Sequence, residues 1–361
     1  MQIIFARFIV GIILFQLAGC AQLQPYPKSD HYDGSKFFNP ADPEGNSLWD
    51  GLKLLFAFHF ESWPELIEND TVENDTIKNV QAVTVQGRPG KDEVAITFVN
   101  HASLLIQTQQ TTLLTDPVWS DRVSPLGWIG PRRHRKAGIA FADLPKIDVV
   151  VISHNHYDHM DLETLKRLND RFHPFFFVPL GNKKLLEDSG IEQVVELDWW
   201  QSYQVTSGLK LSLTPAAHFS GRGLFDRDRS LWGSYHLSFN GHSLYFGGDT
   251  AYASHFKAIQ ERFGPPDIAL LPIGAYEPRW FMKRVHMDPT EAVQAHLDLG
   301  ARQSIGMHFG TFQLTNEGID QPVKDLNLAL QEKKITAREF SVLPEGRTTM
   351  FKVGQEYSAS R

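Results

Sequence analysis

The sequence is most informative at Val149-Val150-Val151-Ile152-Ser153-His154-Asn155-His156-Tyr157-Asp158-His159-Met160-Asp161. This stretch opens with four apolar, β-branched residues, which is typical of a buried strand. Three histidines and an aspartate follow within six positions, 154 to 159. Neutral imidazoles and carboxylates are the ligands that zinc-like divalent ions prefer. The stretch therefore predicts a metal site at the end of a buried strand, and a polar turn rich in histidine by chance is the alternative.

Spacing divides these side chains into two pairs. Residues two apart in an extended segment point the same way, so His154 and His156 can hold one ion. Asp158 and His159 follow where the chain turns into a helix expected over 161–171, and they most naturally serve a neighbouring ion. Two ions about 3.5–4 Å apart would flank a bridging water and lower its pKa toward neutrality. Such a site makes hydroxide at physiological pH.

Length and composition limit the class of protein. With 361 residues, 42% hydrophobic and 21% charged, the chain can bury a large core and holds one large α/β domain or two ordinary ones. The net charge of -7 argues against generic nucleic-acid binding, because phosphate backbones favour a basic surface. One local cationic stretch, 131–136, is either a solvated loop or a contact for anionic lipid head groups.

The N-terminal residues predict export and lipidation. Residues 1–19 carry one positive charge, at Arg7, and an apolar run, 8–15, that is too short to span a membrane comfortably. The following Leu17-Ala18-Gly19-Cys20 resembles the lipobox of bacterial lipoproteins, and Cys20 is the only cysteine of the chain. We expect a signal peptide over 1–19 and a lipidated Cys20 that anchors the protein to a bilayer, in the outer membrane of a bacterial cell envelope. An ordinary signal peptide or an uncleaved anchor is the alternative.

The remaining chain is expected to form a tether with an N-terminal arm, 20–90, and one main domain, 91–361. Regular structure should begin near Val94. Strands are expected at 94–98, 103–107, 111–116, 149–152, 175–178, 194–197, 209–214, 235–239, 243–246, 268–273 and 303–307, and helices at 161–171, 183–188 and 290–299. A meander followed by helices occurs twice, around 94–200 and 209–310. Two such halves facing each other would form a four-layer α/β sandwich.

Three further strands deliver a metal-type ligand at their ends. His218 follows the strand 209–214, Asp249 follows 243–246, and His308 follows 303–307. Together with the first stretch, the candidate ligands are His154, His156, Asp158, His159, His218, Asp249 and His308.

The pattern His-x-His-x-Asp-His with a distant His, Asp and His resembles the metallo-β-lactamase fold superfamily, over nearly everything from Val94 to the C-terminus. This resemblance implies a four-layer αββα sandwich and a pair of zinc ions. It assigns the first zinc to His154, His156 and His218. It assigns the second zinc to Asp158, His159 and His308, with Asp249 bridging the two.

A narrower resemblance is to the N-acylphosphatidylethanolamine-hydrolysing phospholipase D family. It is carried by 115–117, 130–133, 152–161, 196–200, 231–234, 262–265, 308–312 and, most specifically, Pro272-Ile273-Gly274-Ala275-Tyr276-Glu277-Pro278-Arg279-Trp280-Phe281-Met282-Lys283. The family activity would be cleavage of a membrane phospholipid to an N-acylethanolamine and phosphatidic acid, with zinc-bound hydroxide attacking phosphorus.

Supporting residues are also expected around the metals. Asp116 either orients a ligand histidine through its ring N–H or ends a strand in an Asp-Pro turn. Tyr157 either reaches the substrate phosphate or packs as an aromatic ring. His286 matches a non-ligand active-site histidine of the family, so it and Asp158 are the expected catalytic residues; a histidine satisfied within the core is the alternative. The mammalian members carry an amide side chain just before this histidine, whereas this chain has Val285, so a contact to the substrate head group is in question.

Two other functions compete with the phosphodiesterase. The same metals would serve a lactone, ester or amide hydrolase, because the fold does not determine the reaction. A lipid-binding envelope lipoprotein without catalysis is disfavoured, because a structural four-coordinate site has no need of Asp249. Nothing specific in the sequence indicates β-lactam hydrolysis.

Overall fold

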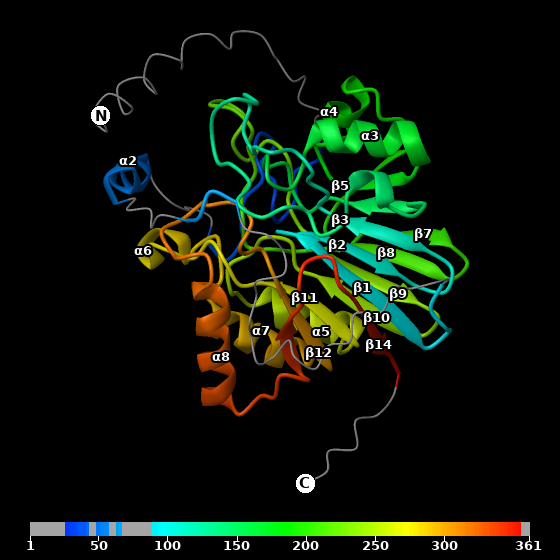
Figure 1. Cartoon of the computed structure of the whole chain (residues 1–361). Coiled ribbons are helices and arrows are strands. Elements are labelled where there is room, and N and C mark those ends of the chain that lie inside the picture. The colour runs from blue at the N-terminus through cyan, green and yellow to red at the C-terminus, as the bar shows by residue number, and fades with distance from the viewer. Residues whose placement is uncertain (1–25, 43–47, 58–62, 67–87, 355–361) are drawn as a thin grey trace.

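Two seven-stranded β-sheets lie face to face, and helices cover the outer face of each (Figure 1). The computed structural model describes residues 26–42, 48–57, 63–66 and 88–354. The expected four-layer αββα sandwich is thereby confirmed. The predicted signal peptide and Cys20 lie outside the described residues. Within the described ranges, no helix is long and apolar enough to cross a membrane.

The two sheets share one internal plan. In spatial order the first contains β14 (Thr348–Lys352), β1 (Glu93–Asn100), β2 (Ser103–Gln107), β3 (Thr112–Thr115), β4 (Val149–Val151), β5 (Phe175–Pro179) and β6 (Val194–Leu197). The second contains β7 (Ser202–Thr206), β8 (Leu209–Thr214), β9 (Ser234–Phe239), β10 (His242–Phe246), β11 (Ile268–Pro272), β12 (Gln303–Met307) and β13 (Phe340–Val342). In both, the first four strands pair antiparallel and each later strand pairs parallel to its neighbour.

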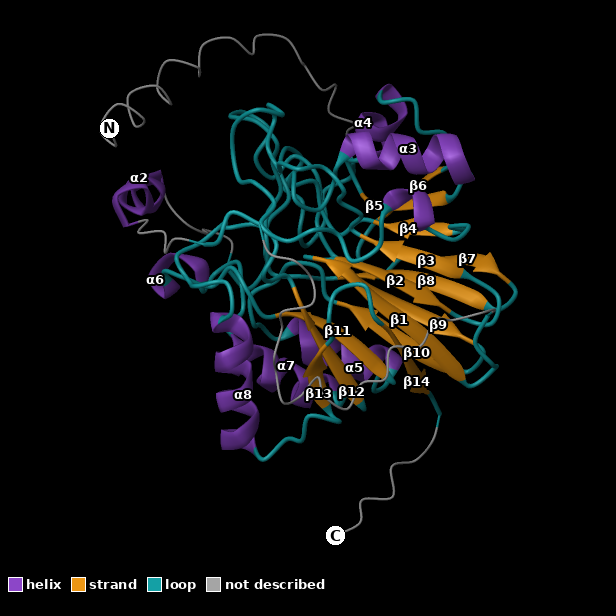
Figure 2. Ribbon diagram, viewed as in Figure 1, coloured by secondary structure: helices purple, strands orange, loops and turns teal. Residues whose placement is uncertain are grey.

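Helices complete the outer layers, as Figure 2 shows. The first sheet is covered by α3 (Leu162–Phe172) and α4 (Lys183–Asp188), and the second by α5 (His255–Phe263), α7 (Pro289–Leu299) and α8 (Gln321–Lys333). The described chain also has α2 (Leu48–Ala57), the short α6 (Arg279–Met282) and a 3-10 turn, η2 (Phe141–Asp143). Asp161 caps α3 by accepting a hydrogen bond from the backbone N–H of Thr164, and Asp288 caps α7 in a capping box with Glu291.

Strand β4 explains why its sequence is apolar without alternation. Val149 and Val151 belong to the core between the two sheets, whereas Val150 belongs to the core under α3 and α4. The strand is therefore buried on both faces, which only a continuous apolar run can satisfy. The polar residues that follow β4 therefore lie where the sheet ends, beside both of these apolar cores.

Two sequence-based interpretations were wrong. Regular structure begins before Val94, because the apolar part of the N-terminal arm forms α2. The cationic stretch 131–136 is not a freely solvated loop: Arg133 and Arg135 are buried. Arg133 donates to the backbone carbonyl of Val118, and Arg135 forms an ion pair of 3.1 Å with the buried Glu345. These two arginines stabilise the fold and cannot contact lipid head groups.

Candidate metal centre

The centre forms where strands of both sheets end. His154 and His156 follow β4, His218 follows β8, Asp249 follows β10, and His308 follows β12. The backbone at Asp249 comes close to that of the first half because Gly248 has a φ of +56°, and a Cβ atom there would collide with the side chain of Ser153. Since both sheets end at the same place, side chains far apart in the sequence meet.

Three imidazoles form the first group. Nδ1 of His156 lies 2.8 Å from Nε2 of His154 and 3.3 Å from Nε2 of His218. Nitrogen atoms of all three rings lie within 4.8 Å of one another. Nitrogen lone pairs that converge in this way suit a single shared cation.

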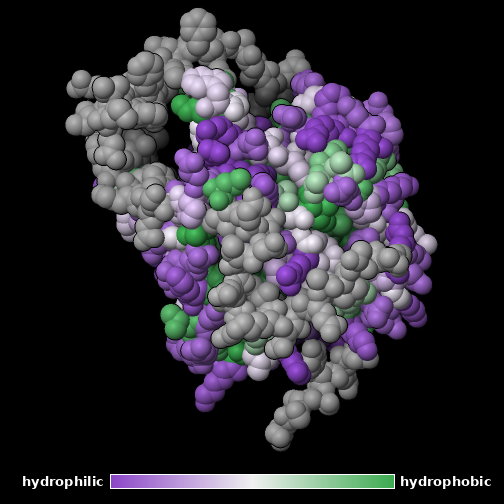
Figure 3. Space-filling model, viewed as in Figure 1, coloured by the Kyte–Doolittle hydropathy of each residue, from purple (hydrophilic) through white to green (hydrophobic). Residues whose placement is uncertain are grey.

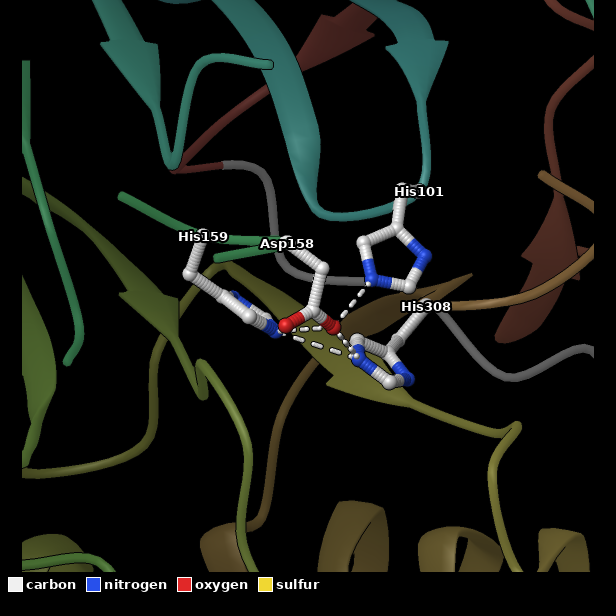
Figure 4. A group of neighbouring side chains, drawn as sticks. All are labelled: His101, Asp158, His159 and His308. Atoms are coloured by element: carbon white, nitrogen blue, oxygen red, sulfur yellow. Dashed lines mark hydrogen bonds and ion pairs between the residues drawn. The ribbon is translucent and has the colours of Figure 1, made fainter. Parts of the chain in front are cut away.

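The second group contains Asp158, His159 and His308, which Figure 4 shows pointing toward one another. Nε2 of His159 lies 3.1 Å from Nε2 of His308. Oδ2 of Asp158 lies 3.3 Å from the first of these nitrogens and 3.5 Å from the second. The group offers one carboxylate and two imidazoles to one cation.

Asp249 lies between the two groups. Its Oδ2 atom lies 3.1 Å from Nε2 of His159 and 3.7 Å from Nε2 of His218, and its Oδ1 atom lies 3.2 Å from Nε2 of His308. The carboxylate is buried, and Oδ1 makes no hydrogen bond among the described residues. The structure thus brings all the candidate ligands together and places Asp249 between the two groups.

His101 joins the second group, although the sequence analysis missed it. Its buried ring places Nε2 3.0 Å from Oδ2 of Asp158, and its ring centroid lies 4.0 Å from that of His308 (Figure 4). The backbone carbonyl of His101 also accepts the N–H of His308, at 2.8 Å. His101 directly follows β1, so the same rule that identified the other strand-end ligands would have found it.

Asp116 lies behind the second group, at the end of β3. It accepts hydrogen bonds from the backbone N–H of Ser153 at 2.7 Å and from the hydroxyl of Ser153 at 2.6 Å. Its Oδ2 atom lies 2.7 Å from Nδ1 of His159. A carboxylate on Nδ1 leaves Nε2 to face the centre, which is the arrangement expected for a metal-binding histidine. The first group has an equivalent contact, because Nδ1 of His218 lies 2.8 Å from the backbone carbonyl of Val285.

The two other predicted residues lie at the wall of the centre. His286 is buried, and its Nδ1 atom lies 3.9 Å from Oδ2 of Asp249 without a hydrogen-bond partner among the described residues. Tyr157 is half-buried and donates its hydroxyl to the backbone carbonyl of Arg222 at 2.9 Å. The guanidinium of Arg222 lies 3.9 Å from the centroid of the Tyr157 ring.

Electrostatics make the cluster attractive to cations. Burial, together with the neighbouring histidines, lowers the pKa of His156 to about 3, and burial lowers that of His218 to about 4. Burial alone would raise the pKa of Asp158 and Asp249, but the charge on His159 outweighs it and holds both well below the usual range. Burial would lower the pKa of His308, but Asp249 and Asp158 raise it to about 9. The imidazoles of the first group are therefore neutral, as a divalent ion requires, whereas His159 and His308 hold protons that they would release on binding one.

The donor set therefore fits metal ions. Imidazole nitrogens that face one another cannot all be donors. The buried carboxylate of Asp249 and the half-buried carboxylate of Asp158 need positive charge nearby. His and Asp ligands suit zinc, and a carboxylate between two groups suits a dinuclear site.

Comparison with known proteins agrees with this geometry. Residues 111–309 match the family described as Beta-lactamase superfamily domain. The chain is 37% identical to the N-acyl-phosphatidylethanolamine-hydrolyzing phospholipase D 1 of Caenorhabditis elegans over 320 residues, which are 84% of this chain and 90% of that relative. It is 39% identical over 222 residues to the mitochondrial N-acyl-phosphatidylethanolamine-hydrolyzing phospholipase D of Saccharomyces cerevisiae, covering 60% of this chain and 47% of that relative.

Solved structures support the fold. The structure of Igni18, a metallo hydrolase from Ignicoccus hospitalis, superposes with a TM-score of 0.54 at 23% sequence identity, covering 73% of this chain and 100% of that chain. At this level of identity the likeness establishes the fold alone. With the family match and the similarity to the nematode relative, the conclusion is that this chain is a metal-dependent hydrolase of the metallo-β-lactamase fold and belongs to the N-acyl-phosphatidylethanolamine-hydrolysing phospholipase D family.

Proposed function

We propose that the chain is a dizinc phosphodiesterase of phospholipase D type, which cleaves N-acylphosphatidylethanolamine or a related phospholipid to an N-acylethanolamine and phosphatidic acid. The position of Asp249 between two ligand groups carries the proposal, because two adjacent cations can stabilise both the attacking and the leaving oxygen of a phosphodiester. The names of the nematode and yeast relatives support the choice of substrate.

The residues of the chain have separate tasks in this reaction. His154, His156 and His218 would hold one ion and Asp158, His159 and His308 the other. Bound divalent ions would supply an acidified water and would polarise a phosphoryl oxygen. Asp116 keeps His159 oriented, and the carbonyl of Val285 does the same for His218.

His286 is the residue that we place against the substrate. Its Nδ1 atom has no partner among the described residues and faces the centre near Asp249, so it can form a hydrogen bond with a substrate oxygen. Tyr157 contributes its ring to the wall, because its hydroxyl is already donated to Arg222. Val285 presents only its carbonyl, toward His218, so it does not replace an amide side chain as a head-group contact.

One assay separates the candidate reactions. Purified protein incubated with N-acylphosphatidylethanolamine should release N-acylethanolamine and phosphatidic acid, which mass spectrometry identifies, and metal analysis should find two zinc ions per chain. Release of neither product, together with opening of lactones or cleavage of esters, would assign the chain to the carbonyl hydrolases of the same fold. Turnover of none of these substrates would leave a lipid-binding role.

Asp158→Asn tests the metal centre within that assay. The substitution keeps the size of the side chain and removes its charge from beside His159 and His308, so turnover should be abolished. An unchanged far-UV circular dichroism spectrum would show that the fold is intact. Full activity of this variant would refute the ligand assignment.

We also propose that Cys20 is lipidated and anchors the enzyme at a membrane of the bacterial envelope. Support comes from the lipobox-like Leu17-Ala18-Gly19-Cys20 and from the amphiphilic substrate. Labelled palmitate should enter the parent protein and should not enter the Cys20→Ser variant, which fractionation should find outside the membrane pellet. Equal labelling of both would contradict lipidation at this residue.

A further inference from the structure

Two loops rise beside the metal centre. The first, residues 121–132, is called the tryptophan loop here, and the second, residues 219–230, the phenylalanine loop. A bridge between Arg122 and Arg132 closes the first at its base, and the backbone N–H of Asp228 closes the second by donating to the carbonyl of Ser220 at 3.0 Å. In Figure 1 both loops, teal and yellow-green, lie at the upper end of the molecule.

Tyr157, which lies between two candidate metal ligands in the sequence, packs between residues that belong to or adjoin the two loops. Val123 of the tryptophan loop belongs to the apolar cluster on which the Tyr157 ring packs. Arg222 of the phenylalanine loop accepts the Tyr157 hydroxyl and covers its ring. The loops are therefore neighbours, and the metal centre lies at their common base.

The tips of these loops present large apolar side chains to solvent. Trp128 is 69% exposed, Leu224 is 61% exposed and Phe225 is 80% exposed. The backbone around them is held in place: the Ser124 hydroxyl donates to the carbonyl of Leu126 at 2.6 Å, and the Asp226 carboxylate accepts the N–H of Gly223 at 2.8 Å. Exposed apolar groups gathered at one end of a protein mark an interaction site. Figure 3 shows apolar side chains among hydrophilic ones at this end.

The charge of the loops points to the occupant. The loops contain five arginines and three aspartates, in a chain whose net charge is -7. Arg132 and Arg227 are exposed, whereas the Arg222 guanidinium donates to the backbone carbonyls of Asn155 and Met160. Arginine pairs well with phosphate groups, and tryptophan is favoured at the level of lipid head groups. Apolar tips beside the exposed Arg132 and Arg227 match the surface of an anionic phospholipid bilayer.

We propose that the tips of the tryptophan and phenylalanine loops form a membrane-docking surface, which inserts Trp128, Leu224 and Phe225 into an anionic phospholipid bilayer and so brings the metal centre to the head groups. The role of this surface in bringing phospholipid substrate to the metal centre rests on the proposed function. The binding of the loops to a bilayer does not. Docking by the loops is separate from the lipid anchor proposed at Cys20, since the two loops, 121–132 and 219–230, lie beside the metal centre.

The experiment uses the full chain with Cys20→Ser, so that no acyl chain is attached. Cosedimentation is measured with vesicles of phosphatidylethanolamine and phosphatidylglycerol, and with vesicles of phosphatidylcholine alone. The parent should bind the anionic vesicles more tightly, and added salt should weaken this preference. Leu224→Ser/Phe225→Ser and Trp128→Ser should each bind the anionic vesicles at least about tenfold more weakly.

A matched control is available on the helices of the second sheet. Leu297 in α7 is 46% exposed and Leu328 in α8 is 63% exposed, and both helices lie away from the loops (Figure 1). Leu297→Ser/Leu328→Ser should bind vesicles like the parent. Loop variants that bind as the parent does, or a control that loses as much affinity, would overturn the docking surface. A parent dimer that the loop variants convert to monomer would also overturn it, since the tips would then pair two copies of the chain.

Hydrolysis of a soluble phosphodiester, bis(p-nitrophenyl) phosphate, measures catalysis without membrane binding, so the docking surface and the proposed function are tested separately. Loop variants should hydrolyse this phosphodiester at the parental rate while losing activity on vesicles. If the parent binds vesicles through the loops but releases no N-acylethanolamine, the proposed reaction fails and the docking surface stands. If the parent cleaves the phospholipid and the loop variants bind and cleave equally well, the docking surface fails and the reaction stands.

Discussion

At the scale of single residues, Asp158 has a hydrogen-bond partner, His101, that is not one of the predicted ligands. Nε2 of His101 lies 3.0 Å from its Oδ2 atom, so this histidine reaches a candidate ligand from the turn between β1 and β2. The carbonyl of His101 accepts the N–H of His308, so one residue positions ligands from both halves of the molecule. Burial is the main cause that lowers the pKa of His101 to about 3, and the charge on His308 lowers it further.

His101→Ala should weaken metal binding. Loss of an outer partner of a metal ligand typically costs about 10–100-fold in affinity, because the ligand is no longer oriented. The affinity is measured by competition with a chromophoric chelator. His101→Gln should recover part of it, since an amide N–H can still donate to Asp158. Equal affinities for parent, Ala and Gln variants would show that His101 only fills space.

The candidate ligands could be predicted because each follows an apolar strand, and a strand end places its side chain at the edge of the sheet. His101 obeys this rule, but it stands alone in a two-residue turn between β1 and β2, without a second ligand type beside it. The sequence predicts Asp116 either as the partner of a ligand histidine or as a strand-ending residue, but it does not indicate which histidine. Only the packing of β3 beside β4 brings Asp116 to His159. Contacts between elements depend on three-dimensional neighbours that spacing does not specify.

At the scale of elements, the ion pair between Arg135 and Glu345 joins the segment after the tryptophan loop to the segment before β14. Both side chains are buried. Burial raises the pKa of Glu345, and Arg135 opposes that rise. A buried pair of this kind depends on both partners, because a single remaining charge has no compensation.

Glu345→Gln should therefore lower the free energy of unfolding by about 3–5 kcal/mol. Urea denaturation followed by tryptophan fluorescence measures the change. The double variant Arg135→Met/Glu345→Leu removes both charges with similar volume and should be less destabilised than the single variant. A single variant as stable as the parent would mean that water solvates Arg135.

The N-terminal segment 26–42 is attached to the sandwich through His31. Nε2 of His31 lies 2.8 Å from Oδ1 of Asp198, Nδ1 lies 2.6 Å from Oδ1 of Asp30, and the ring stacks on Trp199 at 4.4 Å. Burial lowers the pKa of this histidine, but the hydrogen bonds and charges of Asp198 and Asp30 outweigh burial, so its pKa is raised above 6.5.

A raised pKa makes this attachment pH-dependent. Protonated His31 stabilises the folded state fully below its unfolded pKa of about 6.5, and the contribution is lost as the pH rises through the higher folded value. His31→Gln should therefore destabilise the protein more at about pH 6 than at about pH 9. Hydrogen exchange of residues 26–42 at the two pH values measures the difference. A variant effect that is the same at both would contradict a charged His31.

Element prediction succeeded for most of the buried strands, but it missed one strand at an exposed edge and one helix with a buried face. The bounds of β2, β6, β8, β12 and α4 agree with those expected. Strand β7 was missed: Tyr203 and Val205 alternate with polar residues, but the segment is only five residues long and mostly exposed. Helix α8 was also missed, although its buried Val323, Leu326 and Leu330 have helical spacing.

At the scale of the whole molecule, the ligand groups join the two halves of the sandwich. His154, His156, Asp158 and His159 come from the first half, and His218, Asp249 and His308 come from the second. Removal of metal should therefore reduce stability as well as activity. A ligand present at about 1,000 times its Kd contributes about 4 kcal/mol to the folded state.

Chelation provides the measurement. Protein treated with a strong chelator should lose activity and should melt at a lower temperature in calorimetry, and added zinc should restore both. The Asp158→Asn variant serves as the control, since its melting temperature should respond less to zinc. Identical melting curves with and without chelator would show that metal does not join the halves.

The prediction of two similar halves agrees with the sheets, which share one order of antiparallel and parallel pairs. The exception is β14, which comes from the C-terminus and pairs with β1 at the outer edge of the first sheet. The halves repeat in sequence order, and nothing in that repeat predicts that the last strand returns to the first half. Only the unpaired edge of β1 requires it.

That returning strand affects the order of events during synthesis. A nascent chain can form β1 to β6 early, but the first sheet lacks its outermost strand until the ribosome has added residues 348–352. A premature stop codon late in the gene would therefore affect the sheet that is synthesised first, because β1 would have an unpaired edge that can pair with other chains. For the same reason, the first half cannot be expressed as a complete unit when the gene is divided between β6 and β7, because β14 then lies on the other product.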